Sequence, residues 1–252
     1  MPALAVAGSG GASPGSGGAS PGSSASSPSV QPGNTTVSAT GEGITLQTNA
    51  SAFVRSGVSV TGTVPAGDGG AAVEIDQLSS PSSSWTAVTV VHALSSGSFS
   101  AIVHTTRTGP LTLRAVLQGN QASTSTASAP PAVSLTVYRR SIATLYGPGF
   151  YGHRTACGTI LRRRTIGVAN RTLPCGTEVQ VYYKGSVITV PVIDRGPYAH
   201  HANWDLTMAT ARVLGMQGTA RVGAAAIPSA TSGSGTSPGA TGTTGGGMPS
   251  AQ

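Results

Sequence analysis

The pattern of hydrophobic and polar positions between residues 36 and 138 is a series of short alternating or β-branched runs separated by turn residues. Apolar side chains tend to recur at every second position, and no segment has the period of an amphipathic helix, so half-buried strands are expected. Strands spaced by roughly 8 to 12 residues are typical of an antiparallel, immunoglobulin-like β-sandwich. The predicted strands are 44–48, 58–64, 72–78, 85–94, 98–105, 111–118 and 133–138.

The pattern changes after residue 140, where strands are punctuated by glycine. One helix is predicted at 207–214, because it offers a short apolar face and Gly215 provides a C-terminal stop. The expected result is a compact β-barrel with one helix packed on it. Its predicted strands are 142–146, 166–169, 178–183, 186–193 and 220–227.

Both ends of the chain differ from this middle part. Residues 7–35 are nearly all Gly, Ala, Ser and Pro, and residues 229–252 repeat that composition. Such segments bury too little apolar surface to offset their conformational entropy. The chain is therefore predicted to be all-β in four parts: a disordered segment at 1–35, a β-sandwich at 36–138, a barrel at 139–228 and a disordered tail at 229–252.

Charge is distributed unevenly. The chain has a net charge of +7, and residues 139–228 contain 11 Lys and Arg against 3 carboxylates. A one-sided basic balance favours an anionic or polyhydroxylated partner, with solubilising charge as the plain alternative. Nucleic acid is disfavoured because the chain has no basic helix, stacked aromatic pair or zinc spacing.

An extracytoplasmic location is expected. No apolar stretch approaches the eighteen residues of a membrane-spanning helix, and residues 1–7 resemble the end of a signal peptide. The two cysteines, Cys157 and Cys175, are not in metal-binding spacing, and no cofactor or metal is expected. A disulfide is favoured over two reduced thiols, because the flexible ends and low charge density are typical of extracellular proteins.

Acid–base chemistry has few candidates in the second half of the chain. Asp194, Asp205 and Glu178 are the only carboxylates after residue 76. Two neighbouring carboxylates raise the pKa of one of them, which suits a general acid. Each aspartate also has a structural alternative: Asp194 as the cap of the turn that follows it, and Asp205 as the N-cap of the predicted helix.

Five linked motifs occur in order: ATLYGPGF at 143–150, RTACG at 154–158, VANRTLPCGT at 168–177, DRGPY at 194–198 and WDL at 204–206. Together they resemble the rare lipoprotein A-like domains. The resemblance spans about residues 141–227, and it implies a six-stranded double-psi β-barrel, as in expansins and barwin-like proteins. It also implies a disulfide between Cys157 and Cys175, as in secreted relatives.

The resemblance implies a lytic transglycosylase that acts on peptidoglycan glycan strands in the bacterial cell wall. Asp205 takes the position of the general acid and Asp194 that of a supporting aspartate. Cleavage of a glycosidic bond needs a carboxylic acid of raised pKa over the leaving oxygen. One such group suffices for a lytic transglycosylase, because the substrate's own 6-hydroxyl attacks the anomeric carbon.

Aromatic faces beside hydrogen-bonding groups suit a sugar chain, although barrel or turn packing is the structural alternative for each residue. The predicted substrate-binding residues are Tyr146, Tyr151, His153, Asn170, Arg195, Tyr198 and Trp204. The basic run 162–164 would favour anionic wall polymers, or it is a solvated turn.

Two positions depart from the family pattern. Thr159 stands where active relatives usually have Glu, and Asn170 stands where they have His. These departures motivate an alternative function, that of a non-catalytic, expansin-like protein that binds peptidoglycan or polysaccharide in the wall.

Overall fold

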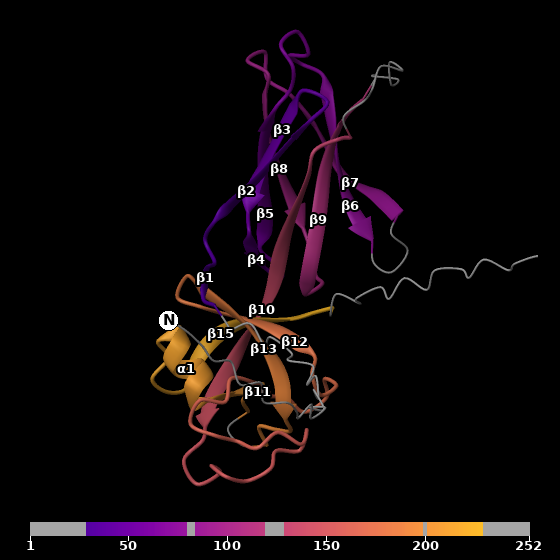
Figure 1. Ribbon diagram of the computed structural model, residues 1–252. Helices are drawn as coiled ribbons and strands as arrows, with labels where there is room; N and C mark the ends of the chain where they lie inside the picture. The colour runs from indigo at the N-terminus through magenta and orange to yellow at the C-terminus, as the bar shows by residue number, and fades with distance from the viewer. Residues whose placement is uncertain (1–28, 80–83, 119–128, 199–200, 229–252) are drawn as a thin grey trace, which may run out of the picture.

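The computed structural model describes residues 29–79, 84–118, 129–198 and 201–228. The fold is almost entirely β-structure, with a sandwich at one end of an elongated molecule and a barrel at the other (Figure 1). The predicted signal-like start, most of the predicted disordered segment 1–35 and the whole predicted tail 229–252 lie outside the described residues. No helix within the described ranges is both long enough and apolar enough to cross a membrane.

The sandwich consists of two sheets. The first contains, in spatial order, β2 (Thr36–Gly41), β3 (Ile44–Asn49), β5 (Gly57–Thr63) and β8 (Ser98–His104). The second contains β10 (Ala132–Tyr146), β9 (Gly109–Leu117), β6 (Ala72–Ser79) and β7 (Ser84–His92), and the short β4 (Ser51–Phe53) pairs with β10 in parallel. The predicted sandwich is present, with β2 and β4 as additional strands; its immunoglobulin-like character stays a prediction.

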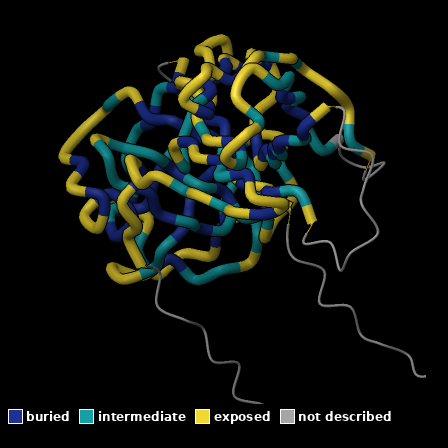
Figure 2. The backbone as a smooth tube through the Cα atoms, turned by 90° about the horizontal axis from the view of Figure 1, so that it is seen from above, coloured by how far each residue is buried: buried dark blue, intermediate teal, exposed yellow. Residues whose placement is uncertain are grey.

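The core of the sandwich follows the alternation of its sequence. Inward residues of both sheets, including Ile44, Val60, Ile75 and Leu113, belong to one buried cluster. Figure 2 shows buried positions in the interior of the molecule and exposed positions around its periphery. In β2, by contrast, Val37 and Ala39 are only partly buried. Its small and polar side chains give a weak alternation, and for this reason the hydrophobic pattern did not predict that strand.

The barrel is a closed ring of six strands. Around the ring lie β10, β15 (Ala220–Ile227), β12 (Glu178–Tyr183), β13 (Ser186–Asp194), β11 (Val168–Ala169) and β14 (Trp204–Thr207), which pairs back with β10. Parallel and antiparallel pairs are mixed. The six-stranded barrel is thus confirmed, including β14, which the hydrophobic pattern did not predict.

The predicted helix is present as α1 (Met208–Leu214). Its N-cap is Thr207, whose hydroxyl accepts a hydrogen bond from the backbone N–H of Thr210. Gly215 ends the helix in a left-handed conformation (φ 71°), which glycine adopts without steric penalty. Since Thr207 is the N-cap, the structural alternative considered for Asp205 is wrong.

The strand β10 belongs to both parts of the molecule (Figure 1). Val133, Leu135 and Val137 contribute to the sandwich core, whereas Ala143 contributes to the barrel core. The predicted boundary between residues 138 and 139 therefore falls inside a continuous strand. Its buried odd-numbered positions are interrupted by exposed Arg139, where the two cores part.

The chain also joins the barrel before it enters the sandwich. Gln31 and Pro32 form β1 (Gln31–Pro32), which pairs with β13, and the hydroxyl of Tyr182 donates to Asn34 Oδ1 at 2.7 Å. The prediction of disorder up to residue 35 is therefore wrong for this last part. The local composition is poor in apolar side chains, but pairing with the barrel supplies the backbone partners that composition does not reveal.

An aromatic cluster fills the junction between the two parts. The rings of Phe53, Tyr138 and Tyr182 lie with centroids 5.4 to 5.9 Å apart. The hydroxyl of Tyr138 donates to Gln180 Oε1 at 2.8 Å. Together with β1 and β10, this packing fixes the barrel against the sandwich.

Candidate active site

Three neighbouring strands bring the two candidate carboxylates together. In β11, Ala169 pairs with Asp194 of β13 on one side and with Asp205 of β14 on the other. Residues directly opposite each other on neighbouring strands present their side chains to the same face of a sheet. The methyl group of Ala169 therefore leaves the space between the two carboxylates open.

Asp194 and Asp205 line one cleft of about 360 Å³. Of the predicted substrate-binding residues, Tyr146, Arg195 and Tyr198 line it as well, and the ring of Tyr198 is largely exposed. The cleft has six further lining residues that the sequence did not identify as site residues: Thr144, Leu145, Phe150, Ala169, Gly196 and Pro197.

Asp205 lies half-buried in the middle of β14. Its Oδ1 accepts a hydrogen bond of 2.9 Å from the hydroxyl of Thr144, the residue opposite it on β10. Burial raises the pKa of the Asp205 carboxyl, the Thr144 hydrogen bond opposes this rise, and the charge of Asp194 adds to it. Its environment therefore favours a carboxyl group that holds its proton at a higher pH than an ordinary aspartate.

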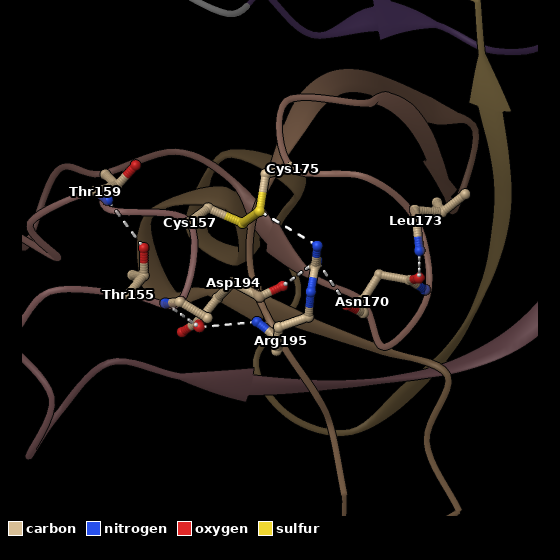
Figure 3. The surroundings of a disulfide bond; sticks show 9 residues. Thr155, Cys157, Thr159, Asn170, Leu173, Cys175, Asp194 and Arg195 are labelled. Atoms are coloured by element: carbon tan, nitrogen blue, oxygen red, sulfur yellow. Dashed lines mark hydrogen bonds between the residues drawn. A yellow bond between two sulfur atoms is a disulfide. The ribbon is translucent and has the colours of Figure 1, made fainter.

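Asp194, by contrast, is anchored to the backbone (Figure 3). Its Oδ1 accepts hydrogen bonds from the backbone N–H groups of Ala156, at 2.9 Å, and of Arg195, at 2.8 Å. The contact with Arg195 fits the expected capping of the turn after Asp194, and the contact with Ala156 joins Asp194 to a second loop. They also fix a carboxylate oxygen at the edge of the cleft, so the structural and supporting interpretations are compatible.

The hydroxyl of Tyr146 is the third polar group of the cleft. It is buried and has no hydrogen-bond partner among the described residues. Burial raises the pKa of Tyr146, and the charges of Asp194 and Asp205 raise it further. The group therefore remains a protonated hydrogen-bond donor at physiological pH, next to both carboxylates.

Arg195 forms no ion pair with either carboxylate of the cleft in the described part of the chain. Figure 3 shows its guanidinium between Asn170 and Cys175: Nη1 donates to the backbone oxygen of Asn170 at 3.3 Å, and Nη2 contacts Cys175 Sγ at 3.3 Å. The disulfide between Cys157 and Cys175 is present, with 5.6 Å between the two Cα atoms, which confirms the predicted pairing. It ties the loop that carries Ala156, a partner of Asp194, to the loop beside Arg195.

Four of the predicted substrate-binding residues lie outside this cleft. Trp204 packs in the barrel core, and Tyr151 lies beneath the guanidinium of Arg163 at 5.3 Å. Exposed His153 is held in its loop by backbone hydrogen bonds. Asn170 Oδ1 accepts hydrogen bonds from the backbone N–H groups at positions 172 and 173, so its side chain caps a turn.

Thr159, the other departure from the family pattern, also lies outside the cleft. Its backbone N–H donates to the hydroxyl of Thr155 at 3.1 Å (Figure 3). Neither Thr159 nor Asn170 therefore supplies an acid or base next to Asp205. No group of three or more potential metal ligands occurs in the part of the chain that the structure describes.

The sequence of the barrel region is similar to that of known proteins. Residues 139–228, which cover the barrel, match the family described as lytic transglycolase. The barrel is therefore similar to the rare lipoprotein A-like domains. The two aspartates of its cleft thus lie in the region that the family match covers.

Curated proteins similar to part of this chain are named endolytic peptidoglycan transglycosylases. The "Probable endolytic peptidoglycan transglycosylase RlpA" of Synechocystis is 38% identical over 87 residues, covering 34% of this chain and 27% of the relative. That of Aquifex aeolicus is 41% identical over 81 residues, covering 31% and 36%. The "Endolytic peptidoglycan transglycosylase RlpA" of Campylobacter jejuni is 34% identical over 97 residues, covering 37% and 35%. The chain thus spans about a quarter to a third of the length of these relatives.

Proposed function

We propose that this protein is a lytic transglycosylase that cleaves peptidoglycan glycan strands in the bacterial cell wall. The observation that carries the proposal is the half-buried Asp205, whose pKa is raised by burial and whose carboxyl group lines an open cleft beside Asp194. A carboxyl group in this setting is suited to deliver a proton to a leaving oxygen. The names of the relatives support the choice of substrate.

The reaction requires one acid that becomes a base. Protonated Asp205 donates its proton to the glycosidic oxygen while the bond from that oxygen to the anomeric carbon breaks. The 6-hydroxyl of the same sugar then attacks the anomeric carbon, and its proton returns to the Asp205 carboxylate. The products are a 1,6-anhydro sugar end and a free hydroxyl, and no water is consumed.

Neighbouring groups divide the supporting roles. The negative charge of Asp194 raises the pKa of Asp205, and its backbone hydrogen bonds keep that charge in place. Thr144 orients the acid through its hydrogen bond. The buried hydroxyl of Tyr146 is a neutral donor that has no hydrogen-bond partner among the described residues, and the exposed ring of Tyr198 offers an apolar face to a sugar.

Two finer proposals concern location and partners. The disulfide is consistent with an oxidising, extracytoplasmic compartment, so we propose secretion to the cell wall. The arginines at 162–164 are exposed, and we propose that this turn contacts anionic wall polymers.

Single substitutions of the two aspartates test the proposal. Asp205→Asn is expected to abolish the release of soluble fragments from purified sacculi, because the Asn amide is too weak an acid to protonate the leaving oxygen. Asp194→Asn is expected to lower release by about tenfold to a hundredfold, since it removes a supporting charge and not the acid. Equal rates for wild type and Asp205→Asn would contradict the assignment of the acid.

A second candidate function is an expansin-like protein that binds wall polysaccharide without cleaving it. It is favoured by the capping role of Asn170, which provides no titratable group where active relatives have His. This function predicts retention on insoluble wall that survives Asp205→Asn. New glycan ends produced by the wild type would exclude it.

A further inference from the structure

Two adjoining cavities lie between the sandwich and the barrel, outside the candidate active site. Each has a volume of about 310 Å³, and they share Thr108 and Ala226 in their walls. We call them together the junction groove. Arg107 lines one cavity, and Arg139 and Arg171 line the other.

The groove is a site of unbalanced positive charge. None of the seven carboxylates of the chain lines either cavity. Within the described residues, the one ion pair joins Asp76 and Arg114 in the sandwich. The three arginines of the groove are exposed and form no ion pair there, so they are free to meet an anion.

The fold presents these arginines in defined positions. Arg139 lies on β10 between Val137, which belongs to the sandwich core, and Ala143, which belongs to the barrel core. Arg140 turns to the other side of the strand and stacks on Phe53 at 4.2 Å. Arg171 is held by a hydrogen bond of 3.0 Å from its Nη2 to the backbone oxygen of Ala202, which orders its guanidinium.

The remaining walls suit a polymer with sugar and polar parts. Leu173, Trp204 and the alanines at 224–226 supply apolar surface, and Asn170, Thr172 and Asn203 supply polar groups. The groove also adjoins the active-site cleft. Ala169 and Asp205 line the cleft, while Asn170, which follows β11, and Trp204, which precedes Asp205 on β14, line the groove.

We propose that the junction groove binds the oxyanions, carboxylate or phosphodiester, of a cell-wall polymer. Arginine pairs with either group through charge-assisted and often bidentate hydrogen bonds. The inference rests on the proposed wall location but not on catalysis at Asp205. It gives the sandwich a function in binding, because Arg107 and Thr108 come from the sandwich side of the groove.

The test is co-sedimentation of the full chain with insoluble cell walls, in an Asp205→Asn background so that the polymer stays intact. The groove variant combines Arg107→Gln, Arg139→Gln and Arg171→Gln. A control combines Arg55→Gln, Arg212→Gln and Arg221→Gln, which remove the same charge from exposed positions outside the groove. Melting temperatures of all three proteins show whether they fold alike.

We expect wall affinity to fall about tenfold or more in the groove variant and to change little in the control. A matching variant with lysine at the three positions is expected to recover part of the affinity if folding is intact. Equal binding by the groove variant and the control would overturn the inference.

Treated walls identify the anion. Amidation of the wall carboxyl groups with a carbodiimide and methylamine eliminates their negative charge, and extraction with hydrofluoric acid eliminates phosphodiester-linked polymers. On one of these two treated walls, the protein with the intact groove should bind no more tightly than the groove variant. An advantage that persists on walls given both treatments would overturn the inference. Wild-type protein that binds through the groove but releases no fragments would remove only the catalytic proposal.

Discussion

The sandwich and the barrel each hold an aspartate away from bulk water, but they treat its charge in opposite ways. In the sandwich, Asp76 is almost fully buried and pairs with Arg114 at 2.8 Å, whose guanidinium also stacks on Trp85. In the barrel, Asp205 contacts a neutral hydroxyl and lies near a second acid. Removing one partner of a buried ion pair destabilises a fold, whereas a carboxyl group beside another acid is suited to exchange a proton.

Matched substitutions to asparagine make this difference measurable. Asp76→Asn leaves the charge of Arg114 without its partner, and we expect it to lower the free energy of unfolding by about 3 kcal/mol. Asp205→Asn removes a charge that burial disfavours, so its stability should equal or exceed that of the wild type at neutral pH. Denaturant unfolding and release of fragments from sacculi, measured on both variants, give the comparison.

The comparison fails if the two variants behave alike. Loss of fragment release per folded molecule in Asp76→Asn, or strong destabilisation by Asp205→Asn, would show that the roles of the two aspartates are not separate.

The disulfide sharpens the contrast further, because it lies in the barrel alone. Replacing Cys157 and Cys175 by serine should cost about 2–3 kcal/mol of stability, as the unfolded chain regains the entropy of a closed loop. It should also lower fragment release, since the loop with Ala156 positions Asp194. Unfolding of the wild type with and without a reductant measures this loss of stability. Equal stability under both conditions would contradict the prediction.

The smallest expected effect concerns the pH dependence of cleavage. Thr144→Val removes the hydrogen bond that favours the charged form of Asp205, so the pKa of Asp205 should rise further. Because Asp205 must be protonated to act as the acid, activity falls as pH rises through this pKa. The alkaline limb of the pH–rate profile should therefore move up by about one pH unit or less. Thr144→Ser, which keeps the hydroxyl, should leave it in place.

Local pattern predicted much of this fold. Alternation located the long strands of the sandwich and most strands of the barrel, and the apolar face before Gly215 located α1. Alternation shows which side of a strand a residue faces but not what covers that side. It therefore gave no sign that β10 passes from one core to another, or that β1 pairs with the barrel.

The site was predictable to the extent that its residues were chemically unusual. Asp194 and Asp205 stood out by scarcity, and Tyr146, Arg195 and Tyr198 by the family motifs. Thr144 was missed because its role depends on the parallel pairing of β10 with β14, which brings together residues 61 positions apart. Trp204 and Asn170 belong to motifs too, yet the first packs in the core and the second caps a turn.

The central claim is that Asp205 drives cleavage with the substrate's own hydroxyl as nucleophile. The most direct measurement is mass spectrometry of muropeptides after purified sacculi are incubated with the wild type and, in parallel, with Asp205→Asn. The account predicts 1,6-anhydro ends from the wild type and none from the variant. Reducing ends formed by water, or no new ends from the wild type, would contradict it.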